Sequence, residues 1–558
     1  MPVHSRSPVR DPCAGDISAS RACPEITRRG ETLRPIDYFD TAADMYRARP
    51  AVQNTDGTMI SFDELRALSG RIAAALRARL EWRDAAPIGI YSPNDWRVIA
   101  CTLGIMRAGA TVVPLHAKAH VEQNARYVEQ LQPVCLFYHS SLEEGIGQIR
   151  ARLPTSALLV CLDGNGADVS LEQLLRVDAG YVDDWSDAYG NVSRPVYIRQ
   201  TSGTTGEPKV IVGDIASFDA TQVVLRQRLH HEECEPVCLV AAPLSHAAGV
   251  HAFAAMTIGA SLVIMRDFDP VEMLRNIQRF RVTHMWLPAS ALYLLLSCPD
   301  LERFEYSSLR SIVLGASATS PAILREAVVT FGPCVSVNYS QIESGFLSWL
   351  DAKTVALAVA GHHAGRLRSS GQSVYASRIA IMDEEGLLLR DGESGEIVVR
   401  GPSVKPYILK PYETDVVETA TAQRYGWHHT GDIGYFDDEG YLYVTGRKKD
   451  LIISAGFKIS AADVERVIME MSEVAECAVI GIPDEVRGES VKAIVTVKTG
   501  KTVTAKMIVS HCRARLGRLQ APSSVEQWDE LPRSAVGKID KRRIRERFGS
   551  VASTVTAE

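Results

Sequence analysis

The 558-residue sequence lacks the marks of several large protein classes. No apolar run approaches the roughly 18 residues of a membrane-spanning helix, so no membrane span is expected. Its 61 basic residues do not exceed its 67 acidic ones, and this balance argues against a nucleic-acid partner. The motifs G-x-S-x-G, G-x-G-x-x-G and H-E-x-x-H are absent, which argues against the common hydrolases and dehydrogenases.

Cysteine usage indicates a reducing compartment. The eleven cysteines are an odd number and contain no C-x-x-C pair. The closest two, Cys234 and Cys238, have no matching histidine or cysteine pair to complete a zinc site. We therefore expect reduced, mostly buried thiols in a cytoplasmic protein. Residues 1–30 are rich in Arg, Ser and Pro without a hydrophobic segment, which predicts a disordered tail and not a secretion signal.

The chain is too long for one ordinary core, so two or more domains are expected. Up to about residue 340, amphipathic helices such as 62–80, capped by Ser61, alternate with short apolar strands. This rhythm predicts an α/β fold with parallel sheets and ligands at the strand ends. Strands and turns dominate from about residue 375, and a compact segment with a helix at 460–471 comes last. We place a domain boundary at Gly446-Arg447 and find no internal repeat.

The most informative segment is 201–209, which reads Thr-Ser-Gly-Thr-Thr-Gly-Glu-Pro-Lys. Small residues let backbone N–H groups approach phosphate oxygens, hydroxyls add donors and Lys209 adds charge. Flanking apolar runs at 196–198 and 210–212 predict a strand hairpin, and the Walker spacing is absent. A flexible linker is the alternative, and the ordered Pro-Lys ending between two strands argues against it. The candidate phosphate ligands are Thr201, Ser202, Gly203, Thr204, Thr205 and Lys209.

Further motifs follow this phosphate loop in order. His246 closes a Pro-Leu-Ser-His stretch, and the small residues 315–318 follow a strand, where a base could lie against bare backbone. Tyr339 offers an aromatic face and Glu343 a carboxylate. The last motifs are Thr-Gly-Asp at 430–432, Gly-Arg-Lys-Lys-Asp at 446–450 and Pro-Arg-Ser-Ala-Val-Gly-Lys at 532–538. Each motif alone is a weak signal, whereas their joint order and spacing are a strong one.

Together these motifs resemble the adenylate-forming superfamily of acyl-CoA synthetases, peptide-synthetase adenylation domains and luciferases. The resemblance covers roughly residues 35–545. It implies an N-terminal domain, here 31–446, of two parallel α/β sheets plus a β-rich subdomain, and a small mobile α+β C-terminal domain, here 447–558. It also implies that a carboxylate and ATP form an acyl-adenylate and pyrophosphate. The acyl group then passes to a thiol after the two domains rotate.

The resemblance implies a role for each motif residue. The phosphate loop would hold the β and γ phosphates, Glu343 would bind Mg²⁺, and Lys538 would bridge the carboxylate and the α-phosphate. Such a cation cancels the repulsion between two reacting anions. His246 would flank the acyl site, and Lys449 would occupy the hinge. The other cofactor-binding positions are Gly315, Ala316, Ser317, Asn338, Ser340 and Ile342, with Tyr339 stacked on adenine and Asp432 and Arg447 at the ribose hydroxyls.

Three of these residues could also have a purely structural role instead of a role in the site. Lys538 lies among other basic residues and would otherwise be interpreted as one more solvated charge. Asp432 follows Thr-Gly and would otherwise be an ordinary turn aspartate. For His246, a hydrogen-bonded core histidine and a residue of the acyl site both stay open.

Coenzyme A is the expected thiol. No carrier-like segment is visible, and Gly456, Phe457 and Lys458 lie in a loop that resembles the one lining the pantetheine tunnel of acyl-CoA synthetases. Stand-alone enzymes that load an acyl carrier protein have similar loops and remain the alternative. The acyl-pocket positions are mostly small, which favours a bulky hydrophobic or polycyclic acid, and no obvious cation stands among them to pair a second carboxylate. These positions are Ala247, Gly249, Phe253 and Gly345.

One motif departs from the family. The pattern Tyr-Gly-x-Thr-Glu reads Tyr-Ser-Gln-Ile-Glu at 339–343, so Ile342 replaces a threonine whose hydroxyl faces the α-phosphate region. Loss of a donor to a charged group costs about 1.5–3 kcal/mol, or roughly one to two decades in rate. We expect adenylation to be weak or absent and thioesterification intact, with a companion enzyme supplying the acyl-adenylate. Two alternatives stay open: Ser340 or a backbone N–H compensates, or the chain binds an adenylate without turnover.

Overall fold

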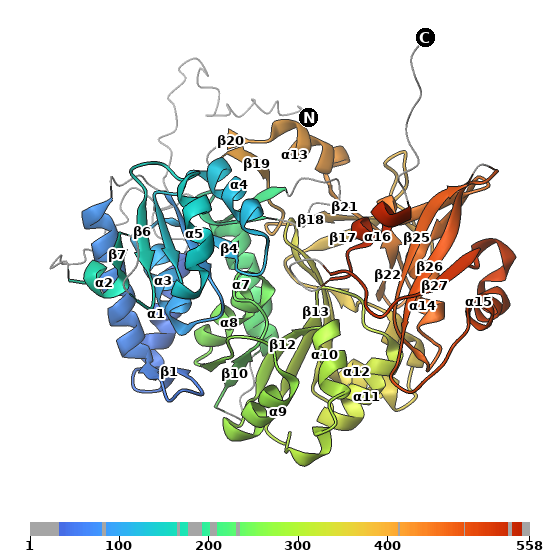
Figure 1. Cartoon of the computed structure of the whole chain (residues 1–558), viewed down its shortest axis with the longest axis horizontal. Coiled ribbons are helices and arrows are strands. Elements are labelled where there is room, and N and C mark those ends of the chain that lie inside the picture. The colour runs from blue at the N-terminus through green and yellow to red at the C-terminus, as the bar shows by residue number, and fades with distance from the viewer. Residues whose placement is uncertain are drawn as a thin grey trace, which may run out of the picture.

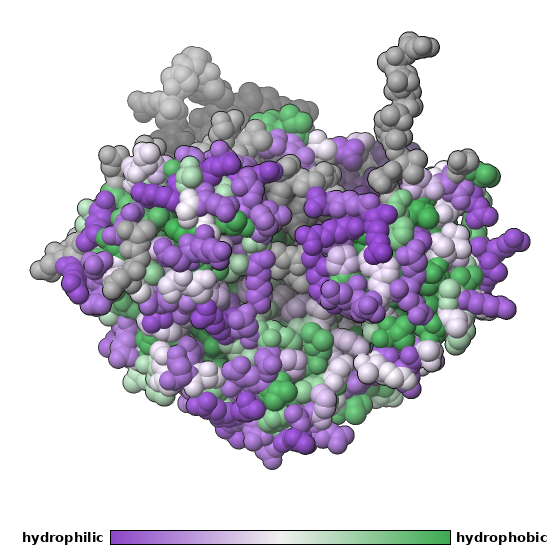
Figure 2. Space-filling view, in the orientation of Figure 1, coloured by the Kyte–Doolittle hydropathy of each residue, from purple (hydrophilic) through white to green (hydrophobic). Residues whose placement is uncertain are grey.

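The computed structural model describes residues 33–80, 85–164, 168–176, 192–200, 209–229, 235–410, 413–484, 486–533 and 538–548 (Figure 1). The predicted tail at 1–30 and most of the phosphate loop, 201–208, lie outside these ranges. Within them, no helix combines the length and apolar character needed to cross a bilayer. Polar residues dominate the face drawn in Figure 2, where the hydrophobic ones form separate small groups.

Two nine-stranded sheets form the larger part of the molecule, and each has a parallel centre. The first has the order β20-β19-β9-β8-β4-β3-β5-β6-β7. Its β8 and β9 pair antiparallel, which confirms the predicted hairpin. The strands are β3 (Pro87–Ser92), β4 (Thr111–His116), β5 (Cys135–Tyr138), β6 (Leu158–Cys161), β7 (Val169–Ser170), β8 (Pro195–Gln200), β9 (Val210–Asp214), β19 (Tyr407–Lys410) and β20 (Glu413–Thr414).

The second sheet has the order β16-β15-β14-β13-β12-β10-β11-β1-β2. Its central strands, from β14 to β1, run parallel, and the edge strands β15, β16 and β2 pair antiparallel. The strands are β1 (Pro50–Gln53), β2 (Met59–Ser61), β10 (Val237–Val240), β11 (Ser261–Ile264), β12 (His284–Pro288), β13 (Ser311–Gly315), β14 (Val335–Gln341), β15 (Gly345–Leu350) and β16 (Gln372–Ser373).

Helices cover both sheets and fill the space between them. In α2 the Ser61 Oγ accepts the N–H of Glu64 at 3.2 Å and the Glu64 carboxylate accepts the N–H of Ser61 at 2.8 Å, a capping box that fixes the helix start. These helices are α1 (Pro35–Tyr46), α2 (Phe62–Arg79), α3 (Trp96–Ala108), α4 (Val121–Leu131), α5 (Glu143–Arg150), α6 (Leu171–Leu174), α7 (Ile215–Leu229), α8 (Ala247–Thr257), α9 (Pro270–Arg279), α10 (Ala289–Leu296), α11 (Pro321–Phe331), α12 (Ala352–Val359) and α13 (Val416–Ala422).

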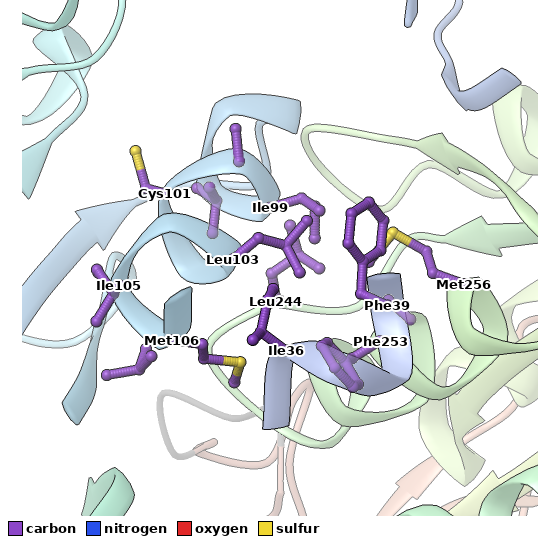
Figure 3. Close-up of a cluster of buried hydrophobic side chains, with 14 of the residues drawn as sticks. Ile36, Phe39, Ile99, Cys101, Leu103, Ile105, Met106, Leu244, Phe253 and Met256 are labelled. Carbon is purple, nitrogen blue, oxygen red and sulfur yellow. The ribbon is translucent and has the colours of Figure 1, made fainter. Parts of the chain in front are cut away.

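The largest hydrophobic core lies where α1, α3 and α8 meet. Figure 3 shows Phe39 of α1, Leu103 of α3, Leu244 before α8 and Phe253 within α8 converging from these elements. All four side chains are buried. This core holds the two sheets in a fixed relation and so fixes the strand ends where the predicted site lies.

Two smaller sheets complete the fold, and the predicted α/β class with a small α+β C-terminal part is confirmed. One has the order β17-β18-β21-β22, with β17 (Arg378–Met382), β18 (Gly395–Arg400), β21 (His428–Phe436) and β22 (Leu442–Arg447). The C-terminal sheet contains β23 (Leu451–Ser454), β24 (Phe457–Ser460), β25 (Val474–Asp484), β26 (Gly488–Val497) and β27 (Ser524–Gln527), with helices α14 (Ala461–Ile468), α15 (Ala505–Gln520) and α16 (Lys541–Phe548).

Candidate functional site

The predicted site residues gather where parallel strands end. β8 ends at Gln200, next in sequence to the phosphate loop, β13 ends at Gly315 and β14 ends at Gln341. His246 follows β10, the strand beside β12 in the same sheet. β8 belongs to the first sheet and β10, β13 and β14 to the second, and in each sheet the carboxyl ends of the parallel strands are the expected ligand site of an α/β fold.

Asp432 of β21 is held by hydrogen bonds from two neighbouring strands. Its carboxylate accepts from Tyr339 Oη at 2.6 Å and from Gln341 Nε2 at 2.7 Å, and it pairs with Arg447 Nε at 2.9 Å. Gln341 Nε2 also donates to Thr430 O at 3.0 Å. Burial and the neighbouring Asp432 raise the pKa of Tyr339 far above its usual value, so the phenol stays protonated. A ligand hydroxyl would therefore meet a carboxylate that is already fixed in position.

The turn after β13 leaves bare backbone beside an unused donor. A Cβ on Gly315 would lie 2.8 Å from Asn338 Oδ1 and 3.0 Å from Trp286 Nε1, so a side chain there would clash. Ala316 is held at φ 69°, in the left-handed region, and both it and Ser317 are exposed. Asn338 Nδ2 is buried without a hydrogen-bond partner among the described residues. This arrangement suits a flat ligand with hydrogen-bond acceptors at its edge, such as a nucleobase.

His246 is a neutral, packed imidazole at the start of α8. Its Nδ1 lies 2.9 Å from Ser245 Oγ, and its ring centroid lies 4.5 Å from that of His116. Burial, followed by the charges of His116, Arg199 and Lys538, lowers the pKa of His246 to about 3. At neutral pH it can position a reactant through hydrogen bonds, but it is a poor proton acceptor.

Lys538 lies at this site although it belongs to the C-terminal part of the chain. Its side chain is more than a third exposed, and partial burial of the ammonium group lowers its pKa. The charge of Arg447 adds to this lowering, while Asp432 and Glu343 oppose it. The structure thus brings Lys538 near the carboxylates to which the family resemblance assigns ribose and Mg²⁺.

Glu343 and Ile342 occupy different surroundings. The Ile342 side chain is half-buried and packs against a cluster of Ile211, Tyr407 and Ala422. Glu343 is also half-buried, but it forms no ion pair with any residue that the structure describes. No group of three or more metal-ligating side chains occurs in the described ranges. One carboxylate together with substrate phosphates is a common Mg²⁺ site, so Glu343 fits that ion.

Lys209 is the one phosphate-loop candidate within the described ranges. Its Nζ pairs with Glu418 of α13 and lies 5.2 Å from the centroid of the Tyr407 ring. The pair is partly exposed, with about a third of each side chain accessible. A phosphate group that binds Lys209 would compete with Glu418 for the same ammonium group.

A cavity of about 860 Å³, counting space open to solvent, runs between α3, α7 and α8. Its wall includes the predicted positions Gly249 and Phe253, but not Ala247 or Gly345. A Cβ on Gly249 would lie 2.0 Å from Leu244 O, so this glycine is required for packing as well as for pocket volume. Most lining residues are apolar, among them Ile99, Leu103, Met106, Phe218 and Met256.

Two polar residues that the sequence did not single out also line this cavity. Arg199 is the single charged residue among those that line it, and it lies outside the pocket positions predicted from the sequence. Gln222 of α7 is 1% exposed, and neither its Oε1 nor its Nε2 has a hydrogen-bond partner among the described residues. In sequence, both look like ordinary polar residues of a strand and a helix, and only the tertiary fold reveals their position.

The C-terminal loop expected to meet coenzyme A lies on the β23–β24 hairpin. Ala455 and Gly456 have φ of 50° and 81°, the two positive values of a tight hairpin turn. Phe457 is 58% exposed, and no described side-chain hydrogen bond, ion pair or ring contact joins it to the strand-end residues. The backbone of Lys458 belongs to β24. Burial and Arg447 lower the pKa of Lys449, the predicted hinge residue, to about 8.

Comparison with known proteins gives two family matches. The family model described as AMP-binding enzyme matches residues 39–408, and the one described as AMP-binding enzyme C-terminal domain matches residues 463–538. The first match alone spans more than half of the chain.

Individual relatives match over nearly their whole length. The indoleacetate–CoA ligase of Aromatoleum aromaticum is 30% identical over 91% of this chain and 97% of its own. A CoA ligase of Mycobacterium tuberculosis, named for a methyl-dioxo-octahydroindenyl propanoyl group, is 31% identical over 87% of this chain and 93% of its own. The amide bond synthetase McbA from Marinactinospora thermotolerans has a similar structure, with a TM-score of 0.82 at 25% identity over 92% of this chain and 100% of that one.

Proposed function

The chain belongs to the adenylate-forming superfamily as an AMP-binding enzyme of the acyl-CoA synthetase type, and on this premise we propose its substrate class and its slow step. The acid is bulky and hydrophobic, and adenylation is slower than thioester formation because Ile342 replaces a hydroxyl donor.

The observation that carries the substrate class is the cavity between α3, α7 and α8. Leu244 and Ser245, which precede His246 in sequence, line this cavity, so it lies close to His246. Most of its other lining residues are apolar. The bicyclic propanoyl group in the name of the Mycobacterium tuberculosis relative supports a bulky acid of this kind.

The chemistry follows from the charges at the strand ends. A carboxylate oxygen attacks the α-phosphorus of ATP and pyrophosphate leaves, after which the CoA thiolate attacks the acyl carbonyl and AMP leaves. Lys538, near Glu343 and Asp432, would balance the negative charge of the first step. Glu343 would hold Mg²⁺, which neutralises phosphate charge when bound. His246, neutral at physiological pH, would position the acyl group.

Ile342 is the reason to expect a slow first step. Its alkyl group is stabilised by the cluster of Ile211, Tyr407 and Ala422 and has no donor to offer a phosphate. Thioester formation from a preformed acyl-adenylate does not need that donor. A companion enzyme that supplies acyl-adenylate would therefore bypass the slow step.

The test uses a panel of bulky hydrophobic acids in two reactions. One contains acid, ATP, Mg²⁺ and CoA, and the other contains synthetic acyl-adenylate and CoA. Acyl-CoA should form in both, and faster in the second. If small acids such as acetate are used better than every bulky acid, the proposed substrate class is wrong.

A further inference from the structure

Arg199 is a charged side chain inside an otherwise uncharged cavity. It lies on β8, two residues before Thr201, and lines the cavity with Tyr197 and Ser245. Its guanidinium lies 4.6 Å from the centroid of the Tyr197 ring. Its Nε is buried without an acceptor, and no described carboxylate pairs with it. The Arg199 side chain is half-buried, and even partial burial of a cation without a described counter-ion is costly, which points to an anion that binds there.

Lys405 is a second cation of this kind. It is 2% exposed, and its Nζ makes one described hydrogen bond, to Ser403 O at 2.8 Å. Its backbone N–H donates to Glu343 O at 2.8 Å, which fixes it beside the proposed Mg²⁺ ligand. No described carboxylate forms an ion pair with its ammonium group. A Cβ on Gly345 would lie 2.8 Å from Ser403 Cβ and 3.8 Å from this Nζ, so the backbone at Gly345 packs closely against Ser403 and Lys405.

The two cations lie on either side of β9 in the first sheet. Arg199 of β8 pairs with Ile211 of β9, and Ile211 pairs in turn with Tyr407 of β19, two residues after Lys405. The hydrogen bond from the Lys405 backbone to Glu343 O connects this part of the sheet to the proposed Mg²⁺ ligand. The strand register therefore brings Arg199 and Lys405 to the same part of the molecule as the expected reactants.

We propose that Arg199 and Lys405 form an oxyanion-binding pair that holds a carboxylate or phosphate oxygen of the reactants during adenylation. This rests on the proposed function, because the adenylation reaction supplies both anions. A new bond forms between a carboxylate oxygen and the α-phosphorus, the bond from that phosphorus to pyrophosphate breaks, and no proton is transferred. The pair stabilises the negative charge of a reactant in the same half-reaction in which Ile342 can donate nothing.

The pair is tested with Arg199→Met and Lys405→Met, each beside its conservative variant, Arg199→Lys or Lys405→Arg. Lys492→Met is a matched control, because Lys492 is also a buried lysine but pairs with Glu526 at 2.7 Å on the C-terminal sheet. Adenylation is measured by ATP–pyrophosphate exchange, and thioester formation by CoA transfer from synthetic acyl-adenylate. Calorimetry with α,β-methylene-ATP and with decanoate measures binding without turnover, and thermal unfolding checks that each variant is folded.

Each Met variant should lower kcat/KM for exchange by about tenfold or more, since each removes a charged donor to an anion. The Lys492→Met control should change it less than about twofold, and the conservative variants should recover most of the loss. Weaker decanoate binding identifies the carboxylate as the anion, and weaker α,β-methylene-ATP binding identifies a phosphate. The proposed pair would be refuted if the Met variants fold, keep the wild-type rate of ATP–pyrophosphate exchange and bind both α,β-methylene-ATP and decanoate as tightly as wild type.

The binding titrations also separate the pair from the proposed function. If wild type forms no acyl-CoA at all, the proposed function fails, while the titrations with α,β-methylene-ATP and decanoate still test whether Arg199 and Lys405 bind an anion.

Discussion

Replacement of Ile342 by threonine is the sharpest test of the slow step. The Ile342 side chain is half-buried against Ile211, Tyr407 and Ala422, so loss of one methylene costs up to about 0.8 kcal/mol of stability, and the hydroxyl placed against this apolar cluster adds to that cost. The new hydroxyl is a donor to a charged group, worth about 1.5–3 kcal/mol, or roughly a 10- to 100-fold gain in the rate of adenylation. ATP–pyrophosphate exchange measures this gain directly.

Valine at the same position is the matched control. Ile342→Val removes the same methylene and has the shape of threonine without the hydroxyl. It should therefore lose less stability than Ile342→Thr, which also places a hydroxyl against the apolar cluster, and it should gain no exchange activity. Equal exchange rates in the two variants would refute the reasoning, because the hydroxyl would then contribute nothing. Transfer from synthetic acyl-adenylate to CoA should change little in either variant.

Three further predictions concern the acyl site. Gly249→Ala should lower the melting temperature by several degrees, because its Cβ would lie 2.0 Å from Leu244 O, and a thermal unfolding curve unchanged from wild type would contradict the clash. Phe253→Ala should enlarge the cavity and raise kcat/KM for bulkier acids relative to decanoate, at a stability cost of about 3–5 kcal/mol, whereas an unchanged preference would place the acyl group elsewhere. Because burial lowers the pKa of His246 to about 3, its ring resonances should show no protonation between about pH 5 and 8 in an NMR titration, and a midpoint inside that range would contradict its neutral role.

The strand and helix pattern was predictable because it depends on local periodicity. The cap at Ser61, the β8–β9 hairpin and the alternation that forms the parallel sheets are all confirmed. Each follows from residues close in sequence, where apolar spacing and turn chemistry act directly. The position of the motifs after predicted strands also indicated ligands at the strand ends, because parallel strands of a sheet have their carboxyl ends on the same side.

Tertiary contacts account for what the sequence did not predict. Arg199 and Lys405 are far apart in sequence and look like ordinary surface charges there, yet the fold places Arg199 in the wall of the cavity and buries Lys405. Gly249 was interpreted as pocket volume, while its contact with Leu244 O gives it a packing role as well. Gly345 was predicted to line the pocket, and in the structure it packs against Ser403, 2.8 Å from where its Cβ would lie. The roles of Thr201–Thr205 in phosphate binding stay a prediction.

The most direct test of the central claim is the initial rate of acyl-CoA formation from the two starting points, with the same bulky hydrophobic acyl group and saturating CoA. We predict product from both, with the reaction from acyl-adenylate faster than that from acid and ATP by roughly one to two decades. Equal rates would contradict a slow adenylation step at Ile342. Absence of acyl-CoA from the acyl-adenylate would contradict the assignment of thioester formation to this protein.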